Sequence, residues 1–334
     1  MIRSFAHYVT KYFSEYLPRH KGVSENTLRS YRDTFVQLTE YFECNLKIQC
    51  QKLSVADFTR RRVLDFLDYL EDNRNVSIST RNQRLAAIHS FFKFIQKNEL
   101  SCYEQCADVL TTEFKKTPEP VIEYLKIEEL RFLFSLPDVS IRRELRDLAV
   151  LTMLYETGAR VQELIDLCLG DATLSSCPTV TLSGKGNKSR IVPIGSDAAS
   201  ILQRYIREYQ IVKPSQHLFT NSQGKSLSRV GVQYIVDKYV ERGRKLEPKI
   251  FTKKITNHSF RHSKSMNLLE AGVNLLYIRD FLGHTSVTTT EIYAKSNAEI
   301  KRKTIEQHSV KLDVSDKYSD TKKNELIDWL KASI

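Results

Sequence analysis

The first third of the chain follows a helical pattern of hydrophobic and polar positions. Apolar side chains recur every three or four residues over residues 28–42 and again over 85–95, which is the spacing of one buried helix face. A Lys-Lys-Thr-Pro-Glu-Pro run then interrupts the pattern, because proline cannot continue a helix. The pattern predicts a helical domain over residues 1–114 and a linker over 115–120.

The rest of the chain mixes two periodicities. Within residues 179–193, two short β-rich segments flank a Gly-Lys-Gly-Asn turn, which predicts a β-hairpin. We therefore expect a mainly α protein with a small β-sheet, in which a mixed α/β domain covers residues 121–315 and a tail covers 316–334. The tail has four apolar positions at helical spacing: Leu326, Ile327, Leu330 and Ile334.

The chain carries an excess of positive charge. It has 334 residues, a formal net charge of +11 and a pI near 9.2, which favours a polyanion as partner. Its first residues contain no long apolar stretch, so we expect neither a signal peptide nor a membrane span.

The six cysteines do not suggest a metal site. They form no CxxC pair, and no group of cysteine and histidine has the spacing of a structural zinc site. We therefore expect no metal and no cofactor. Cys168 and Cys177 lie among apolar residues, which predicts reduced core thiols in a cytosolic protein.

The candidate chemistry gathers in the last third of the chain. His258 and Arg261 are three residues apart in a helical pattern, so both side chains project from one face. A glycine turn precedes His284, and Tyr293 follows on the next helical segment. Cationic and hydrogen-bonding groups beside a phenol can bind a phosphate and attack it. Alone, each piece has a plainer interpretation, as a solvated helix face or a half-buried tyrosine.

A second segment strengthens this hypothesis. Gly158 follows an apolar helical run and is its expected end, so Arg160 opens the next helix with Glu163 one turn later. The segment is either a helix corner with a surface arginine or the source of a second guanidinium for the same phosphate, placed by a carboxylate. Lys185 stands at the tip of the predicted hairpin. The hairpin does not satisfy GxxxxGK[ST], so we reject an ATP-binding loop.

Taken together, these segments resemble the tyrosine recombinases, the family of phage-type integrases and Xer-type resolvases. The words TGARVQEL, GKGNKSRIVP, HSFRHS and FLGHTSVTTTEIY look like that family's three boxes and its β-hairpin, and the resemblance covers essentially the whole chain. A histidine that often follows the tyrosine in this family is absent. The residues in register with the six catalytic positions are Arg160, Lys185, His258, Arg261, His284 and Tyr293.

The resemblance implies covalent DNA cleavage without hydrolysis. Tyr293 is the implied nucleophile, and its phenol, with an ordinary pKa of about 10, needs activation by nearby cations. The resulting 3′-phosphotyrosyl link keeps the bond energy for rejoining, so no ATP is needed. Lys185 is the implied general acid for the 5′-oxygen.

The other catalytic positions are implied to bind the phosphate. Arg160 and Arg261 are implied to stabilise the negative charge on the non-bridging oxygens of the phosphate. His258 and His284 hydrogen-bond the same oxygens or assist proton transfer. Glu163 is implied to orient Arg160 or a histidine.

The implied partner is double-stranded DNA with a short inverted-repeat core site. A homotetramer on two synapsed sites is implied, with partner recombinases or accessory DNA-bending proteins as further candidates. The helical domain is implied to be a core-binding, SAM-like domain, and the tail packs on its own domain or docks into a neighbouring protomer. Ten basic residues are candidates for DNA contacts rather than merely solvated charges: Arg29, Arg32, Arg81, Arg84, Lys115, Lys116, Lys188, Arg190, Lys253 and Lys254.

The resemblance implies site-specific recombination in the integration, excision or transposition of a mobile element. It also implies a bacterial or phage origin and a cytoplasmic, nucleoid-associated location. Three alternatives stay open. Type IB topoisomerase-like relaxation and chromosome dimer resolution use the same chemistry, whereas a non-catalytic DNA-binding protein needs none of it. A covalent protein–DNA adduct separates the last alternative from the others.

Overall fold

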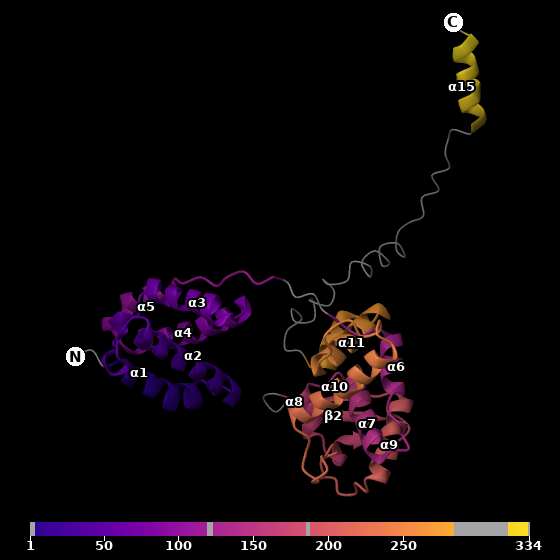
Figure 1. Cartoon of the computed structure of the whole chain (residues 1–334), viewed down its shortest axis with the longest axis horizontal. Coiled ribbons are helices and arrows are strands. Elements are labelled where there is room, and N and C mark those ends of the chain that lie inside the picture. The colour runs from indigo at the N-terminus through magenta and orange to yellow at the C-terminus, as the bar shows by residue number, and fades with distance from the viewer. Residues whose placement is uncertain (1–3, 119–122, 185–187, 284–319, 333–334) are drawn as a thin grey trace. The chain divides into compact units, whose positions relative to one another are not determined.

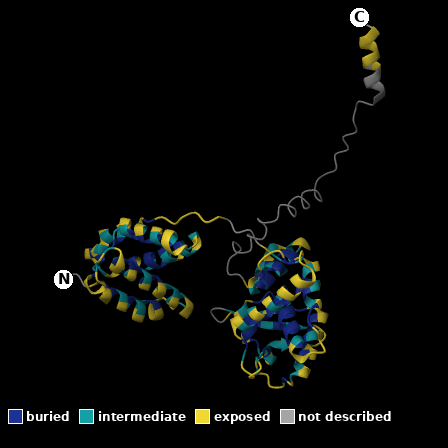
Figure 2. Ribbon diagram, in the orientation of Figure 1, coloured by how far each residue is buried: buried dark blue, intermediate teal, exposed yellow. Residues whose placement is uncertain are grey.

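The structure is a computed structural model that describes residues 4–118, 123–184, 188–283 and 320–332. The chain divides into two compact units, Met1–Pro120 and Val121–Ile334 (Figure 1). Each unit has its own core of buried apolar side chains (Figure 2). The described residues are mainly helical and contain one three-stranded antiparallel sheet, which confirms the predicted fold class.

The first unit is all-helical where the structure describes it. Serine caps start two of its longest helices, because Ser24 and Ser77 accept hydrogen bonds from backbone N–H groups three residues later. The predicted apolar stripes form its core, in which Phe42 and Phe92 are fully buried. Its elements are α1 (Phe5–Lys11), the π-helix η1 (Tyr12–His20), α2 (Glu25–Cys44), the 3-10 turns η2 (Cys50–Lys52) and η3 (Val55–Asp57), α3 (Arg60–Arg74), α4 (Ile78–Asn98), η4 (Leu100–Cys102) and α5 (Tyr103–Leu110).

The second unit is built around a buried helix, α7, against which α9 and α11 pack. The sheet order is β1-β2-β3, with Leu182 opposite Arg190 in the antiparallel pair β2–β3. This pair confirms the hairpin predicted within residues 179–193. The elements are α6 (Ile127–Ser135), α7 (Arg142–Thr157), α8 (Val161–Asp166), η5 (Leu169–Asp171), β1 (Ala172–Thr173), β2 (Thr179–Ser183), β3 (Ser189–Pro193), α9 (Ser196–Glu208), α10 (Arg229–Leu246), α11 (Asn257–Glu270) and α12 (Leu275–Leu282).

Two glycines end helices that meet in this unit. Gly158 ends α7 and Gly283 ends α12, both with left-handed backbone at φ 55° and 65°, a conformation that costs glycine little. A Cβ added at Gly158 would stand 3.0 Å from Leu282 Cδ2, so the ends of the two helices are in close contact. The predicted end of α7 at Gly158 is confirmed.

Helix α15 (Asp320–Ala332) lies in the C-terminal segment. Ile327, Trp329 and Leu330 on this helix are exposed, whereas the side chains of Leu326 and Ile334 are outside the described set. None of the helices within the described ranges has the length and apolar character needed to cross a membrane.

The prediction that Cys177 is a core thiol is wrong. Cys177 is exposed and Cys168 is only half-buried. Cys177 stands in the connection between β1 and β2, and such connections run over the surface because their backbone polar groups need solvent. The buried thiols among the described residues are instead Cys102 and Cys106, in the helical core of the first unit.

Two glycines of α10 predict opposite effects on stability. A Cβ at Gly243 would overlap the ring of Phe251, whereas one at Gly231 would meet only ordinary contacts, the nearest at 3.4 Å. Gly243→Ala should therefore lower the free energy of unfolding by about 1–3 kcal/mol. Gly231→Ala should leave it unchanged or raise it by up to about 1 kcal/mol. Chemical denaturation of both variants checks this, and equal stabilities would contradict the close packing of α10 on Phe251.

Candidate active site

Arg160 stands at the N-terminus of α8, held by Glu163. Arg160 Nη1 donates to Glu163 Oε1 at 2.8 Å, and Glu163 Oε2 accepts the backbone N–H of Arg160 at 2.9 Å. The second contact caps the start of the helix. The Arg160 side chain is 44% exposed and makes no other hydrogen bond to the described residues, so it retains N–H donors for a ligand.

A second arginine binds the same carboxylate. Arg190 on β3 donates from Nη1 to Glu163 Oε1 at 3.1 Å and from Nη2 to Glu163 Oε2 at 2.8 Å. Burial would raise the pKa of Glu163, but the hydrogen bonds from Arg190 and Arg160 and the charge of Arg190 outweigh burial and hold the pKa below its usual value. Glu163 therefore stays ionised and carries two guanidiniums.

Arg261 on α11 ties the ends of two helices together. Its Nη1 donates to the carbonyl oxygen of Gly158 at 2.6 Å, and its Nη2 donates to that of Leu282 at 2.7 Å. These carbonyls lie at the C-terminal ends of α7 and α12, where backbone dipoles favour a cation. Arg261 is buried, so its charge is fixed in place at this junction.

His258 lies one turn before Arg261, at the start of α11. Although part of its side chain is exposed, the surrounding protein reduces its hydration. This desolvation, followed by the charges of Arg261 and Arg160, lowers the pKa of His258 below its usual 6.5. The imidazole is therefore neutral near pH 7.

Three predicted catalytic residues, Lys185, His284 and Tyr293, lie outside the described residues. The residues directly before two of them are described. A Cβ at Gly184 would stand 3.3 Å from Glu163 Oε1, and one at Gly283 would stand 3.1 Å from Arg190 Cδ and Nη1. The structure thus brings Arg160, Glu163, His258 and Arg261 together, with Gly184 and Gly283 packed against the same ion pairs.

Two of the arginines predicted to contact DNA are turned into the first unit. Arg81 is 2% exposed and forms an ion pair with Glu71, so the prediction of an exposed DNA contact at Arg81 is wrong. Arg84 is half-buried and donates from Nη1 to Ser30 O at 3.0 Å and to Thr34 Oγ1 at 3.1 Å. Both side chains are used to join elements of their own unit.

The prediction that Arg190 contacts DNA is also corrected. Its side chain is 13% exposed, and its three nitrogens bind Glu163 and the Phe281 carbonyl. The alternation of side chains along a strand could have predicted this burial. Arg190 lies two residues before the apolar Val192, so both side chains point to the same face, and Val192 is fully buried. The prediction rested on the positive charge of Arg190 and not on the strand face that its side chain occupies.

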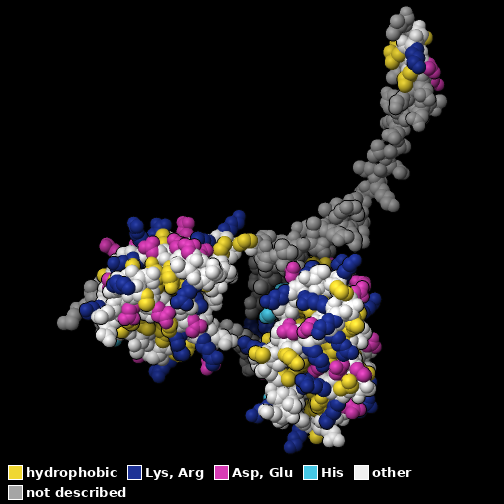
Figure 3. Space-filling view, viewed as in Figure 1, with side chains coloured by type: hydrophobic (Ala, Val, Ile, Leu, Met, Phe, Trp, Pro, Cys, Tyr) yellow, Lys and Arg dark blue, Asp and Glu magenta, His cyan; other side chains and the backbone are white. Residues whose placement is uncertain are grey.

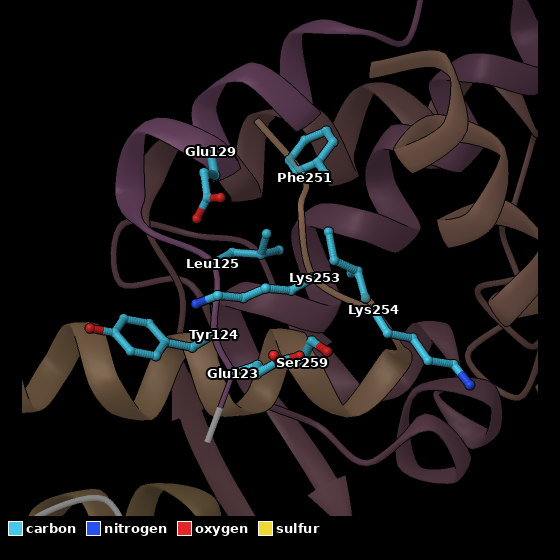
Figure 4. A pocket seen from close by; sticks show the side chains of 9 residues that line it. Glu123, Tyr124, Leu125, Glu129, Phe251, Lys253, Lys254 and Ser259 are labelled. Atoms are coloured by element: carbon cyan, nitrogen blue, oxygen red, sulfur yellow. The ribbon is translucent and has the colours of Figure 1, made fainter. Parts of the chain in front are cut away.

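The other predicted DNA contacts have exposed side chains. Arg29 is paired with Glu25, and Lys115 with Glu71. Lys253 and Lys254 leave the segment before α11 in different directions, with Lys253 Nζ 5.9 Å from the Tyr124 ring (Figure 4). Lysine and arginine side chains lie among acidic ones over the visible face of the second unit (Figure 3). The exposed set is Arg29, Arg32, Lys115, Lys116, Lys188, Lys253 and Lys254.

Lys264, one turn after Arg261, was not among the predicted site residues. Its Nζ lies 3.2 Å from Glu156 Oε2 and 4.8 Å from the centre of the Tyr155 ring. The (i, i+3) spacing from Arg261 was available as a signal. Lys264 and Glu156 join α11 to the end of α7, and thereby support the junction that holds Arg261.

The two arginines predict how His258 titrates. In the free protein the pKa of His258 should lie below 6.5, and Arg160→Gln should raise it because one neighbouring positive charge is lost. Binding of a phosphodiester should also raise it, since the anion offsets both guanidiniums. NMR titration checks these shifts, with His258→Gln to assign the resonance. Arg242→Gln, which removes an equal charge beside Glu144, should leave the titration unchanged. An unchanged His258 pKa in Arg160→Gln would contradict this geometry.

Family comparisons cover both units. The model of the "Phage integrase family" matches residues 124–299. The model of the "Phage integrase, N-terminal SAM-like domain" matches residues 10–99. Tyrosine recombinase XerD of Staphylococcus epidermidis is 33% identical over 296 residues, covering 87% of this chain and 95% of XerD. The integrase/recombinase y4rC of Sinorhizobium fredii is 32% identical over 299 residues, covering 89% and 90%.

The fold has a solved counterpart in the Tn1549 transposon integrase, in complex with transposon right end DNA. The TM-score is 0.68 at 18% identity, over 90% of this chain and 98% of that one. Because both units match family models and relatives above 30% identity align along most of their length, the chain belongs to the phage integrase family and is a tyrosine recombinase.

Proposed function

We propose that this enzyme is a site-specific recombinase that cleaves and rejoins DNA through a 3′-phosphotyrosyl intermediate and a Holliday junction. One observation carries the proposal. Arg261 binds the carbonyl of Gly158, two residues before Arg160, so two arginines about 100 residues apart in sequence come to the same junction, with His258 one turn before Arg261 on α11. A neutral histidine near two guanidiniums suits a phosphate that gains charge during transfer.

Each group has one role in this proposal. Arg160 and Arg261 bind the non-bridging oxygens, and His258 and His284 hydrogen-bond them or assist proton transfer. Tyr293 gives up its phenolic proton to His258 or His284, attacks phosphorus and expels the 5′-oxygen. Lys185 gives that oxygen a proton, so the leaving group departs as a hydroxyl. In the rejoining step the 5′-hydroxyl attacks the phosphotyrosine and releases Tyr293, which conserves the number of phosphoester bonds.

The proposed partner is double-stranded DNA with a short inverted-repeat core site. The net charge of +11 and the exposed lysines and arginines support phosphate contacts. The proposed domains are a core-binding domain at 1–114, a linker at 115–120, a catalytic domain at 121–315 and a tail at 316–334. The proposed assembly is a homotetramer on two synapsed sites, with accessory proteins left open.

We propose integration, excision or transposition of a mobile element as the biological role, on DNA in the bacterial cytoplasm. Support comes from the 32% identity with the integrase/recombinase y4rC. A role like that of the XerD relative has equal sequence support, at 33% identity. Sequencing the DNA junctions formed in cells separates the two, since a mobile element leaves its own ends at new positions and a resolvase does not.

Tyr293→Phe tests the nucleophile. The change removes one hydroxyl and keeps every cation, so site-specific binding should persist while covalent adduct formation is abolished. The measurement is an SDS-resistant complex on a nicked site, with gel shift as the binding control. A persistent adduct would show that another residue is the nucleophile.

Lys185→Ala tests the leaving-group acid. Cleavage of ordinary DNA should fall by about 10²–10⁴-fold, the usual contribution of general acid catalysis. A substrate with sulfur at the 5′-bridging position should restore it, because a thiolate leaves without a proton. Arg160→Ala should not be restored in this way, since its proposed contacts are to non-bridging oxygens. Equal loss on both substrates would remove Lys185 from this role.

Deleting residues 316–334 tests the proposed docking of the tail on a neighbouring protomer. The exposed Ile327 and Leu330 are apolar groups that a short helix normally packs against a partner. The truncated protein should bind one half-site normally and lose cooperative occupancy of the full site in gel shifts. Normal cooperativity and recombination would rule the docking out.

A further inference from the structure

Arg190 is placed as an internal residue by the register of its strand. It pairs with Leu182 across β2–β3 and shares a face with Val192, and both of these neighbours are fully buried. A charged side chain on such a face needs partners, because an unpaired buried charge is very unfavourable. Arg190 finds them on two other segments of the chain.

The guanidinium of Arg190 uses all three of its nitrogens. Nη1 and Nη2 bind the two oxygens of Glu163 at 3.1 and 2.8 Å, and Nε donates to the carbonyl of Phe281 at 2.9 Å. The planar fork of arginine suits this arrangement, whereas a lysine ammonium has neither its shape nor its reach to both sites. Arg190 thus joins the hairpin, α8 and the end of α12.

These contacts lie next to two residues of the proposed reaction. Gly184, which precedes Lys185, approaches Glu163 Oε1, and Gly283, which precedes His284, approaches Arg190 itself. Both are small residues at closely packed points, with added-Cβ distances of 3.3 and 3.1 Å. A shift of the Arg190–Glu163 pair would therefore displace the chain immediately before each of these residues.

We infer that Arg190 is a positioning residue for DNA cleavage: through Glu163 and the Phe281 carbonyl it sets the hairpin that carries Lys185, without contacting DNA. The inference rests on the proposed function. It replaces the prediction that Arg190 binds the DNA backbone. It also separates Arg190 from Lys188, an exposed residue of the same hairpin.

The experiment compares Arg190→Gln with Lys188→Gln in single-turnover cleavage and in DNA binding across salt concentrations. Arg190→Gln should cleave ordinary DNA about 10²-fold more slowly, the cost of a displacement near 1 Å in a catalytic group. It should keep the wild-type salt dependence of binding and recover at least part of its rate on the 5′-bridging sulfur substrate. A phosphate contact at Lys188 would instead lower the salt slope by about one and show no sulfur rescue.

Two controls show whether slower cleavage results from unfolding: the melting temperature of each variant and the conservative change Arg190→Lys. Arg190→Lys should fold and cleave at a rate between wild type and Arg190→Gln. In a double-mutant cycle with Glu163→Gln, the two losses should be clearly non-additive. Wild-type cleavage by Arg190→Gln, a reduced salt slope, or a loss that sulfur leaves unchanged would each overturn the inference.

Cleavage of the sulfur substrate by Lys185→Ala distinguishes a failure of this inference from a failure of the proposed function. Rescue of Lys185→Ala without rescue of Arg190→Gln refutes the role of Arg190 alone. Failure to rescue Lys185→Ala refutes the proposed acid, and the role of Arg190 is then decided by its salt slope and by the double-mutant cycle.

Discussion

The second unit depends on one carboxylate that two guanidiniums share. Glu163 is 5% exposed, and such burial would favour its neutral form if Arg190 and Arg160 did not bind it. Removing Arg190 would leave the buried carboxylate with Arg160 as its remaining guanidinium partner, and Arg160 is 44% exposed. The loss of such a buried partner is more costly than the loss of a surface ion pair. The ion pairs therefore link α8 and the hairpin by electrostatics as well as by packing.

The second constraint is the meeting of helix ends. Helices α7 and α12 both finish at a glycine, and their last carbonyls converge on Arg261. Each end contributes partial negative charge and an acceptor that its own helix cannot satisfy. One buried cation meets both needs and brings His258, one turn earlier on the same helix, to the junction.

Local patterns were sufficient to predict the elements that hold the site. The end of α7 at Gly158, the start of the next helix at Arg160 and the hairpin each follow from a few neighbouring residues. What failed depended on tertiary partners. Arg81 and Arg190 look like surface cations in sequence, but each lies on an inward face with an acidic partner on another element, Glu71 on α3 for one and Glu163 on α8 for the other. A positive charge in the sequence therefore does not by itself indicate an exposed side chain.

Backbone carbonyls help to hold the two internal arginines of the second unit, and this affects which substitutions the junction tolerates. Arg261 binds the carbonyls of Gly158 and Leu282, and Arg190 binds that of Phe281, so three of these anchors are main-chain atoms that every amino acid carries. A substitution at position 281 or 282 that preserves the helix and its packing keeps the anchor, because the acceptor is a backbone carbonyl. The junction is robust to mutational drift at its acceptors, and its fragility is concentrated in the arginines and in the backbone turns that aim the carbonyls at them.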